Sequence, residues 1–221
     1  MAGEGPRGLF VTFEGGDGSG KTTQAERLRA MLVERGRTVV RTREPGGSDV
    51  GEEIREIVLH HRGHINPRAE ALLYAADRAQ HVAQIVRPAL ERGEVVLQDR
   101  YIDSSLAYQG AGRALGVDDV ARLNRWASGG LVPDLTVLLD LDPALARTRL
   151  DAARNRFDRL EAEKLEFHTR VRNVYLDLAA AEPERFLVLD ATADRDDISA
   201  QVAARIEVLL SADATGVGGA D

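Results

Sequence analysis

Short apolar runs alternate with longer amphipathic stretches along almost the whole chain. Five runs have the continuous apolar character of strands buried on both faces of a parallel sheet, and they lie at residues 9–14, 38–40, 95–98, 135–141 and 186–190. Strands that alternate with helices are typical of a parallel sheet covered by helices. The pattern therefore predicts an α/β fold with about five parallel strands.

The stretches between these runs repeat apolar residues every three or four positions, which is the spacing of one helix face. This spacing predicts helices at residues 22–35, 50–59, 68–90, 117–128, 160–180 and 198–210. In the 117–128 helix it places Leu123 and Trp126 on the inward face. The 68–90 helix is expected to be interrupted near Pro88, because proline has no backbone N–H to donate.

The length of 221 residues is enough for one sizeable core and short for two. We expect a single domain at residues 1–211, with a lid at about 144–160 and a flexible tail at 212–221. No apolar run approaches the ~18 residues that would cross a bilayer, and the first residues lack the apolar core of a signal peptide. A cytoplasmic protein with no membrane partner is therefore expected.

The amino-acid composition excludes several further kinds of functional site. The chain has no cysteine, which removes disulfides, thiolate metal sites and cysteine nucleophiles. A net charge of -7 argues against a nucleic-acid partner, so a basic cluster should bind a small anion. His60, His61 and His64 share one polar turn, but no carboxylate or cysteine completes a zinc-binding spacing, and the turn is interpreted as surface structure.

The segment directly after the first apolar run reads GGDGSGKT and matches the pattern G-x-x-x-x-G-K-[ST]. Its glycines let several backbone N–H groups approach one polyphosphate, its lysine reaches the β and γ phosphates, and its hydroxyl can ligate Mg²⁺. The helix that follows would point the positive end of its dipole at the anion. The predicted nucleotide-binding residues are Gly15, Gly16, Asp17, Gly18, Ser19, Gly20, Lys21 and Thr22.

Charged residues stand where the predicted strands end. Arg43 and Glu44 follow the second strand, and Asp99 and Arg100 follow the third. Ligands of open α/β sheets bind just beyond the carboxyl ends of the strands. Arg43 is therefore expected to bind a second phosphate, and Asp99 to hold Mg²⁺ with the hydroxyl of the phosphate loop, in competition with Asp140. Two anion sites imply two nucleotides.

The predicted lid is rich in arginine, with Arg147, Arg149, Arg154, Arg156 and Arg159 within thirteen positions. Phosphoryl transfer develops charge on the γ-phosphate oxygens, and cations on a closing segment would stabilise that charge and exclude water. Alternatively, these side chains form a solvated helix face on which Arg147 and Arg154 pair with Asp151. The sequence leaves both interpretations open.

Five segments, in order along the chain, resemble the thymidylate kinase family. They are FEGGDGSGKTTQ at 13–24, TREPGGS at 42–48, LLYAADRAQH at 72–81, DRYIDSSLAYQG at 99–110 and PDLTVLLDLDP at 133–143. The resemblance implies a P-loop NTPase three-layer sandwich, with a five-stranded parallel sheet flanked by helices and an arginine-rich lid. It also implies a homodimer that transfers the γ-phosphate of ATP to dTMP, with Mg²⁺, for dTTP biosynthesis.

The resemblance further implies roles for individual residues. Asp17 would meet the 3′-hydroxyl of the acceptor, while Arg43 and Arg100 would bind its phosphate. Tyr74, where the family usually has phenylalanine, would stack on thymine, and Arg78, one helical turn on, would bind the base O4. The full set of acceptor-binding residues would be Asp17, Arg43, Glu44, Tyr74, Arg78, Arg100, Ser104, Ser105, Tyr108 and Gln109.

Within this set, Gln109 and Ser105 are the first candidates for reading the base edge, and Tyr108 for disfavouring ribonucleotides. Some family members carry an arginine at the loop position occupied here by Gly18, so the transition-state cation must come from the lid, where Arg154 matches best. The predicted catalytic residues are Lys21, Arg154, Asp17 and Arg100, and the predicted metal ligands are Thr22 and Asp99.

Two other functions stay open on the sequence. Another nucleoside monophosphate kinase, of the UMP or CMP type, would share the phosphate loop and the lid. A non-catalytic ATP-binding switch would bind nucleotide without releasing ADP when an acceptor is added. A GTPase is disfavoured, because no asparagine of the chain is followed by lysine as the guanine-reading N-K-x-D motif requires.

Overall fold

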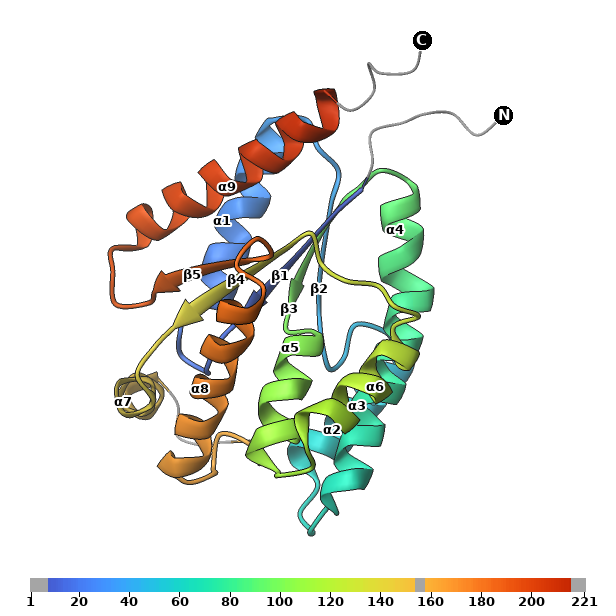
Figure 1. Ribbon diagram of the computed structural model, residues 1–221, viewed down its shortest axis with the longest axis vertical. Helices are drawn as coiled ribbons and strands as arrows, with labels where there is room; N and C mark the ends of the chain where they lie inside the picture. The colour runs from blue at the N-terminus through green and yellow to red at the C-terminus, as the bar shows by residue number, and fades with distance from the viewer. Residues whose placement is uncertain (1–7, 154–157, 216–221) are drawn as a thin grey trace.

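One parallel sheet forms the centre of the protein (Figure 1). The computed structural model describes residues 8–153 and 158–215, and within them the strand order is β2-β3-β1-β4-β5. The strands are β1 (Leu9–Glu14), β2 (Val39–Arg43), β3 (Val95–Asp99), β4 (Leu135–Asp140) and β5 (Phe186–Asp190). The five strands predicted from the sequence are therefore confirmed.

The strand register brings the carboxyl ends of neighbouring strands level with one another. Phe13 of β1 pairs with Asp99 of β3, which pairs in turn with Arg43 of β2. The inner strands β1, β3 and β4 are almost completely buried because both faces are covered, and this is why their sequences are continuously apolar. Charged residues that follow β2 and β3 consequently meet at one edge of the sheet.

Helices cover both faces of the sheet (Figure 1). They are α1 (Lys21–Glu34), α2 (Asp49–His60), α3 (Pro67–His81), α4 (Arg87–Glu91), α5 (Ile102–Ser105), α6 (Val117–Ala127), α7 (Pro143–Ala153), α8 (Leu165–Ala181) and α9 (Arg195–Thr215), with the π-helical segments η1 (Val82–Val86) and η2 (Leu106–Gly112). Helices α1 and α9 pack against each other on one face, and α3 and α8 lie on the other. The predicted three-layer α/β sandwich is therefore confirmed.

Successive residues of β1 point to opposite faces and so belong to different cores. Val11 packs on one side with Leu28 of α1 and Ile206 of α9. Phe10 packs on the other side with Val82, and its ring meets the ring of Tyr101 edge-on at 5.1 Å. The phosphate loop thus leaves the sheet from a strand that is fixed on both faces.

The side of helix α6 that faces the protein interior is not the one that the apolar spacing predicted. Trp126 is 81% exposed, so the prediction that it faces inward is wrong, and Leu123 is only half-buried. The buried residues of α6 are Val120, Asn124 and Ala127, and Asn124, which is 1% exposed, accepts a hydrogen bond from Arg78. The inward face of this helix is therefore made of two small apolar side chains and one buried polar contact.

The interruption predicted near Pro88 is present as η1. The backbone N–H of Arg87 bonds to the carbonyl of Val82, five residues earlier, instead of four. Helix α4 then begins at Arg87 with Pro88 in its first turn, where the missing N–H would have no helical partner. The sequence cannot distinguish a π turn from a break, although both relieve the same conflict.

Two predicted helix boundaries differ from the structure. The helix expected at 160–180 begins at Leu165, because the Asp158 carboxylate accepts the N–H groups of Leu160 and Glu161 and holds a turn there. Helix α9 continues to Thr215, beyond the expected start of the tail. Among the described residues, no helix is long and apolar enough to cross a membrane.

Candidate active site

The predicted phosphate loop joins β1 to α1 and is shaped by its glycines. Gly20 caps α1 with a φ of 96°, and a Cβ on Gly15 would lie 2.4 Å from the carbonyl oxygen of Leu139. The loop curls around the ammonium group of Lys21, which donates to the carbonyls of Gly15 (3.1 Å) and Gly16 (2.9 Å). The backbone therefore has the left-handed conformations that a phosphate loop requires.

The loop opens on a cleft of about 830 Å³ between the ends of β2 and β3, helix α7 and the start of α9. The cations that line the cleft are Lys21, Arg43, Arg55, Arg100, Arg149 and Arg195. Burial, together with nearby Arg100, lowers the pKa of Lys21, although neighbouring carboxylates oppose that shift. Lys21 and Arg100, beside the phosphate loop, favour an anionic ligand there, although five carboxylates also line the cleft, namely Asp17, Glu44, Asp99, Asp158 and Glu161.

Hard oxygen ligands lie together in this cleft. The Thr22 hydroxyl is 3.4 Å from Asp99 Oδ2, and a hydroxyl with a carboxylate is a pair that Mg²⁺ accepts when phosphate oxygens and water complete its shell. The described residues contain no group of three or more His, Asp or Glu side chains that would hold a metal without such help. Asp140, the competing carboxylate, instead binds Arg172 through both oxygens (2.7 and 2.8 Å) and lines a different cavity.

Asp17 and Arg100 form an ion pair at the rim of the cleft, with 2.6 Å between Asp17 Oδ1 and Arg100 Nη2. Burial alone would raise the pKa of Asp17, but Arg100 and then Lys21 outweigh it and lower this pKa to about 2. The Arg100 guanidinium also lies 5.1 Å from the ring centre of Tyr108. Asp17 is therefore an anion fixed between two cations.

Arg100 is held in an unusual backbone conformation, with a φ of 67°. Its N–H bonds to the carbonyl of Phe13 (3.0 Å), and the following N–H, of Tyr101, bonds to the carboxylate of Glu14 (2.7 Å). The same carboxylate accepts from Ser104 (2.6 Å), whose hydroxyl contacts Arg100 Nη1 at 3.3 Å. Sequence reasoning missed Glu14, although Glu14 ends a buried strand as Asp99 does and could have been found by the same signal.

A second cavity, of about 100 Å³, adjoins the cleft. It is lined by nine of the predicted acceptor-binding residues, namely Asp17, Glu44, Tyr74, Arg78, Arg100, Ser104, Ser105, Tyr108 and Gln109. The tenth, Arg43, lines the larger cleft and pairs with Glu52 at 2.9 Å. The structure therefore brings together side chains that come from four separate parts of the sequence. This second cavity is called the acceptor pocket below.

Arg78 is anchored inside the protein, with 2% of its surface exposed. Its guanidinium binds Glu44 (2.8 Å from Nε to Oε2), Ser105 (3.0 Å) and Asn124. Glu44 is held in turn by His81 Nδ1 at 2.8 Å. Arg78 is therefore not a surface arginine, and its burial requires the charged partner that Glu44 supplies.

Arg55 of α2 was missed by the sequence analysis, although it lines both the cleft and the acceptor pocket. Its Nη1 donates to the carbonyl of Pro45 at 2.8 Å, which fixes the guanidinium at the junction of the two cavities. A usable signal existed, because Arg55 is two turns beyond the Ser48 cap of a helix that starts at the ligand-binding edge of the sheet.

The arginines of the predicted lid have different environments. Arg147 pairs with Asp151 at 3.1 Å, as in the surface interpretation. Arg149 reaches the carbonyls of Gly18 (3.4 Å) and Ala191 (3.1 Å) and lines the cleft. The predicted catalytic Arg154, and Arg156, lie outside the described residues, so their role stays a prediction.

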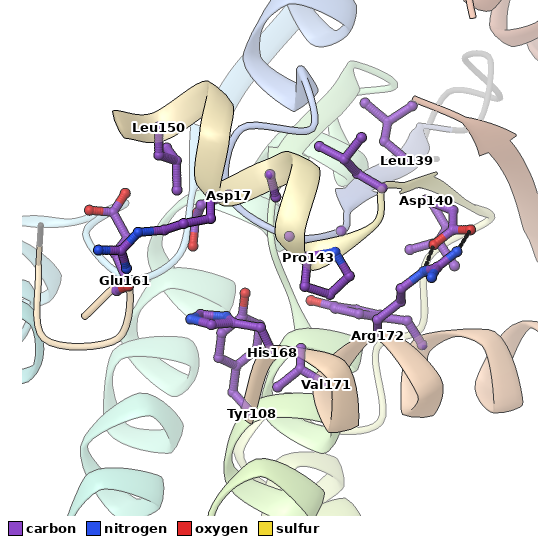
Figure 2. A pocket seen from close by; sticks show the side chains of 17 residues that line it. Asp17, Tyr108, Leu139, Asp140, Pro143, Leu150, Glu161, His168, Val171 and Arg172 are labelled. Carbon is purple, nitrogen blue, oxygen red and sulfur yellow. Dashed lines mark hydrogen bonds and ion pairs between the residues drawn. The ribbon is translucent and has the colours of Figure 1, made fainter. Parts of the chain in front are cut away.

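A third cavity, of about 40 Å³, lies between α7 and α8 (Figure 2). Its walls are largely apolar, with Leu139, Pro143 and Val171 among them. The paired side chains of Asp140 and Arg172 lie at one side of this cavity, as Figure 2 shows. This volume is less than half that of the acceptor pocket, and we assign no ligand to it.

The family model described as Thymidylate kinase matches residues 13–202. The chain belongs to the thymidylate kinase family. It is 68% identical to a thymidylate kinase of Clavibacter sepedonicus over 208 residues, which cover 94% of this chain and 99% of that protein. It is 66% identical to one of Leifsonia xyli subsp. xyli over 200 residues, covering 90% and 95%.

A solved thymidylate kinase structure, from Ehrlichia chaffeensis, is similar in fold. It superposes with a TM-score of 0.73 at 32% sequence identity, and the match covers 92% of this chain and 99% of that one. The chain is therefore a phosphotransferase with the P-loop NTPase fold, and ATP is its co-substrate. The resemblance seen in the sequence is confirmed at the level of the thymidylate kinase family.

Proposed function

We propose that this thymidylate kinase transfers the γ-phosphate of ATP to dTMP at the junction of the cleft and the acceptor pocket. The observation that carries this proposal is the shared wall of the two cavities: Asp17, Glu44, Arg55 and Arg100 line both. Two phosphorylated ligands seated there would have their phosphates adjacent, which is the arrangement that direct transfer requires. The products are dTDP and ADP.

Electrostatic stabilisation supplies most of the catalysis in this proposal. Lys21 binds the β and γ phosphates, while Arg55 and Arg100 bind the phosphate of the acceptor. When dTMP enters, Arg100 turns part of its guanidinium from Asp17 to that phosphate, and Asp17 binds the 3′-hydroxyl. Arg154 brings a further cation to the transferring group when the lid closes, so the charge that develops is met by groups already in place.

Mg²⁺ is the expected cofactor, with Thr22 and Asp99 as its protein ligands. The 3.4 Å approach of a hydroxyl and a carboxylate at the foot of the cleft supports this assignment. When bound, Mg²⁺ would neutralise and orient the phosphates of ATP.

Base recognition falls to the inner end of the acceptor pocket. The ring of Tyr74 stacks on thymine, Arg78 donates to O4, and Gln109 and Ser105 read the remaining edge. The buried anchoring of Arg78 by Glu44 supports this role, because a fixed guanidinium reads one carbonyl position. Tyr108 lines this pocket beside the Arg100 guanidinium, and this position supports a place close to the sugar.

A homodimer is proposed through the surface made by α2, α3 and α6. Val50, Ile57, Leu72 and Trp126 are all between 44% and 81% exposed on these helices, and α3 packs against both α2 and α6. The three helices lie together on one side of the molecule (Figure 1). Large apolar side chains gathered on one surface are typical of a protein–protein contact.

A substrate panel tests the proposed reaction. Purified protein, ATP and Mg²⁺ are incubated with each nucleoside monophosphate, and ADP and the diphosphate product are measured. We expect the highest kcat/KM for dTMP, with dUMP next. Preference for UMP or CMP would overturn the choice of acceptor, and ADP release that is independent of every acceptor would overturn transfer itself. Location in the cytoplasm stays a prediction.

A further inference from the structure

A completely buried carboxylate lies behind the wall of the acceptor pocket. Glu70 is in the first turn of α3, and 0% of its surface is exposed. Burying a charge is costly unless partners replace the lost water. The partners of Glu70 therefore indicate why the charge is there.

Three donors surround the Glu70 carboxylate. Gln109 Nε2 donates to Oε1 at 2.9 Å, Arg113 Nε approaches the same oxygen at 3.2 Å, and the Arg159 guanidinium binds Oε2. Burial would raise the pKa of Glu70, but the Gln109 hydrogen bond and the two guanidinium groups lower it below its usual value. Burial, together with the nearby Glu70 carboxylate, raises the pKa of Tyr74, one turn further along α3. Glu70 is thus an anion with cations on two sides.

An ionised carboxylate can only accept hydrogen bonds, so only the amide nitrogen of Gln109 can face it. Gln109 is 2% exposed and lines the acceptor pocket. With Nε2 committed to Glu70, the remaining polar atom of the side chain is Oε1, to which no other described residue donates. The amide therefore presents an acceptor, and not a donor, to the pocket.

An acceptor in this position distinguishes pyrimidines by their N3 atoms. Thymine and uracil carry an N3–H that can donate to Oε1, whereas cytosine has an N3 lone pair that would be repelled. Arg78, which has donors only, makes the matching distinction at the adjacent position, since it suits a C4 carbonyl and opposes an amino group. A binding site strongly rejects a ligand that leaves the buried polar groups of the site without hydrogen-bond partners.

We infer that Glu70 is a positioning residue that sets the pyrimidine specificity of the acceptor pocket by fixing the orientation of the Gln109 amide. The inference rests on the proposed placement of the acceptor base in this pocket. Glu70 itself does not touch the base. Its two arginine partners keep it ionised, and its ionisation keeps Gln109 in one of two otherwise similar orientations.

The test is Glu70→Gln, which keeps the shape but has a donor and an acceptor. The amide of residue 70 can then pair with Gln109 in either orientation, so Gln109 can turn its N–H₂ toward cytosine N3. We expect the ratio of kcat/KM for dTMP to kcat/KM for dCMP to fall about ten-fold, through both a gain for dCMP and a loss for dTMP. A general weakening of the fold would not raise activity toward dCMP.

Glu163→Gln is the matched control. Glu163 pairs with Arg113 at 2.5 Å, so this variant removes an ion pair from the same cluster without altering the Glu70–Gln109 contact. We expect its dTMP to dCMP ratio to stay within about two-fold of the original protein. If Glu70→Gln is obtained only in aggregated form, Glu70→Asp, which retracts the carboxylate by one methylene, is expected to shift the ratio in the same direction.

Gln109→Met separates the inference from the proposed site. If Glu70 acts through Gln109, Glu70→Gln has no further effect on the ratio in a Gln109→Met background. A ratio unchanged in Glu70→Gln, or an equal effect in both backgrounds, overturns the role of Glu70. If Gln109→Met alone leaves both acceptors unaffected, the base does not lie in this pocket, and the proposed placement fails together with the inference.

Discussion

Asp17 and Arg100 form a 2.6 Å ion pair across the place where the nucleotide cleft joins the acceptor pocket. In this pair the Asp17 carboxylate lies where the acceptor phosphate would bind to Arg100, and the Arg100 guanidinium lies where the 3′-hydroxyl would bind to Asp17. The pair therefore keeps the site organised before substrate arrives. The Arg100 guanidinium donates to the Asp17 carboxylate as it would donate to a phosphate. Substrate binding therefore replaces one anion by another and does not leave a cation unpaired.

Replacing Asp17 by Asn should lower stability in a pH-dependent way. The pKa of Asp17 is lowered from 3.8 to about 2, and a lowered carboxylate pKa contributes stability above the unfolded value that is lost as the pH falls through the folded one. We expect Asp17→Asn to lose about 1–2 kcal/mol at pH 7 and to approach the original protein between pH 4 and 2.

Urea unfolding at a series of pH values measures this difference. Asp196→Asn serves as the control, because Asp196 is 85% exposed in its ion pair with Arg27 and such pairs contribute little. A stability difference that is the same at pH 7 and pH 3 would show that the Asp17 charge is not its source.

Replacing Arg154 by Ala should affect the chemical step and not acceptor binding. The proposed mechanism assigns the transition-state cation to the lid, because Gly18 occupies the loop position at which some family members carry an arginine. We expect Arg154→Ala to lower kcat by about two orders of magnitude with little change in the Kd for dTMP. Arg147→Ala, on the same lid but paired with Asp151, should keep kcat within about three-fold. An unchanged kcat in Arg154→Ala rejects the assignment.

Replacing Arg55 by Ala should weaken binding of the acceptor phosphate. Arg55 is fixed at the junction of the two cavities by the Pro45 carbonyl, and hydrogen bonds to a charged group are worth about 1.5–3 kcal/mol. We expect kcat/KM for dTMP to fall by about 10- to 100-fold in steady-state assays. Arg35→Ala, which breaks a surface pair with Glu207, should leave it unchanged. Equal values for the two variants would remove Arg55 from the site.

Replacing Trp126 by Glu should dissociate the proposed dimer without unfolding the chain. Trp126 is 81% exposed in the single chain, so the fold loses little when the ring is removed. We expect sedimentation velocity to show a dimer for the original protein and a monomer for Trp126→Glu, with similar melting temperatures. Val208→Glu, at an exposed apolar position of α9, is the control that should stay dimeric. A monomeric original protein would refute the interface.

The strands and the phosphate loop could be predicted because their signals are local. Val95 to Leu97 are apolar in succession since both faces of β3 are buried, and Gly15 to Thr22 carry their chemistry in one short segment. The same holds for Ser48, a typical N-cap residue that caps α2 by accepting a hydrogen bond from the backbone N–H of Gly51. Where the role of a residue depends on its immediate neighbours along the chain, the sequence alone is enough to predict that role.

The missed features depend on contacts between distant segments. Asn124 of α6 is buried against Arg78 of α3, and no helical period in α6 records that bond. The burial of Arg78 depends in turn on Glu44, 34 positions earlier. Glu70 looks like an ordinary polar residue near a helix start until Gln109 and Arg159 are seen around it. Buried polar pairs of this kind become visible only when the chain is folded.

The left-handed backbone of Arg100 has a cost of about 1 kcal/mol for any residue with a side chain. Glycine would remove that cost and with it the charge that the proposed reaction needs, so the protein gives up some stability in return for a correctly placed guanidinium. Replacing Glu14 or Ser104, neither of which needs to touch ATP, would loosen the hydrogen bonds that hold the backbone at Arg100. Such a replacement would then affect the reaction through the position of the Arg100 guanidinium.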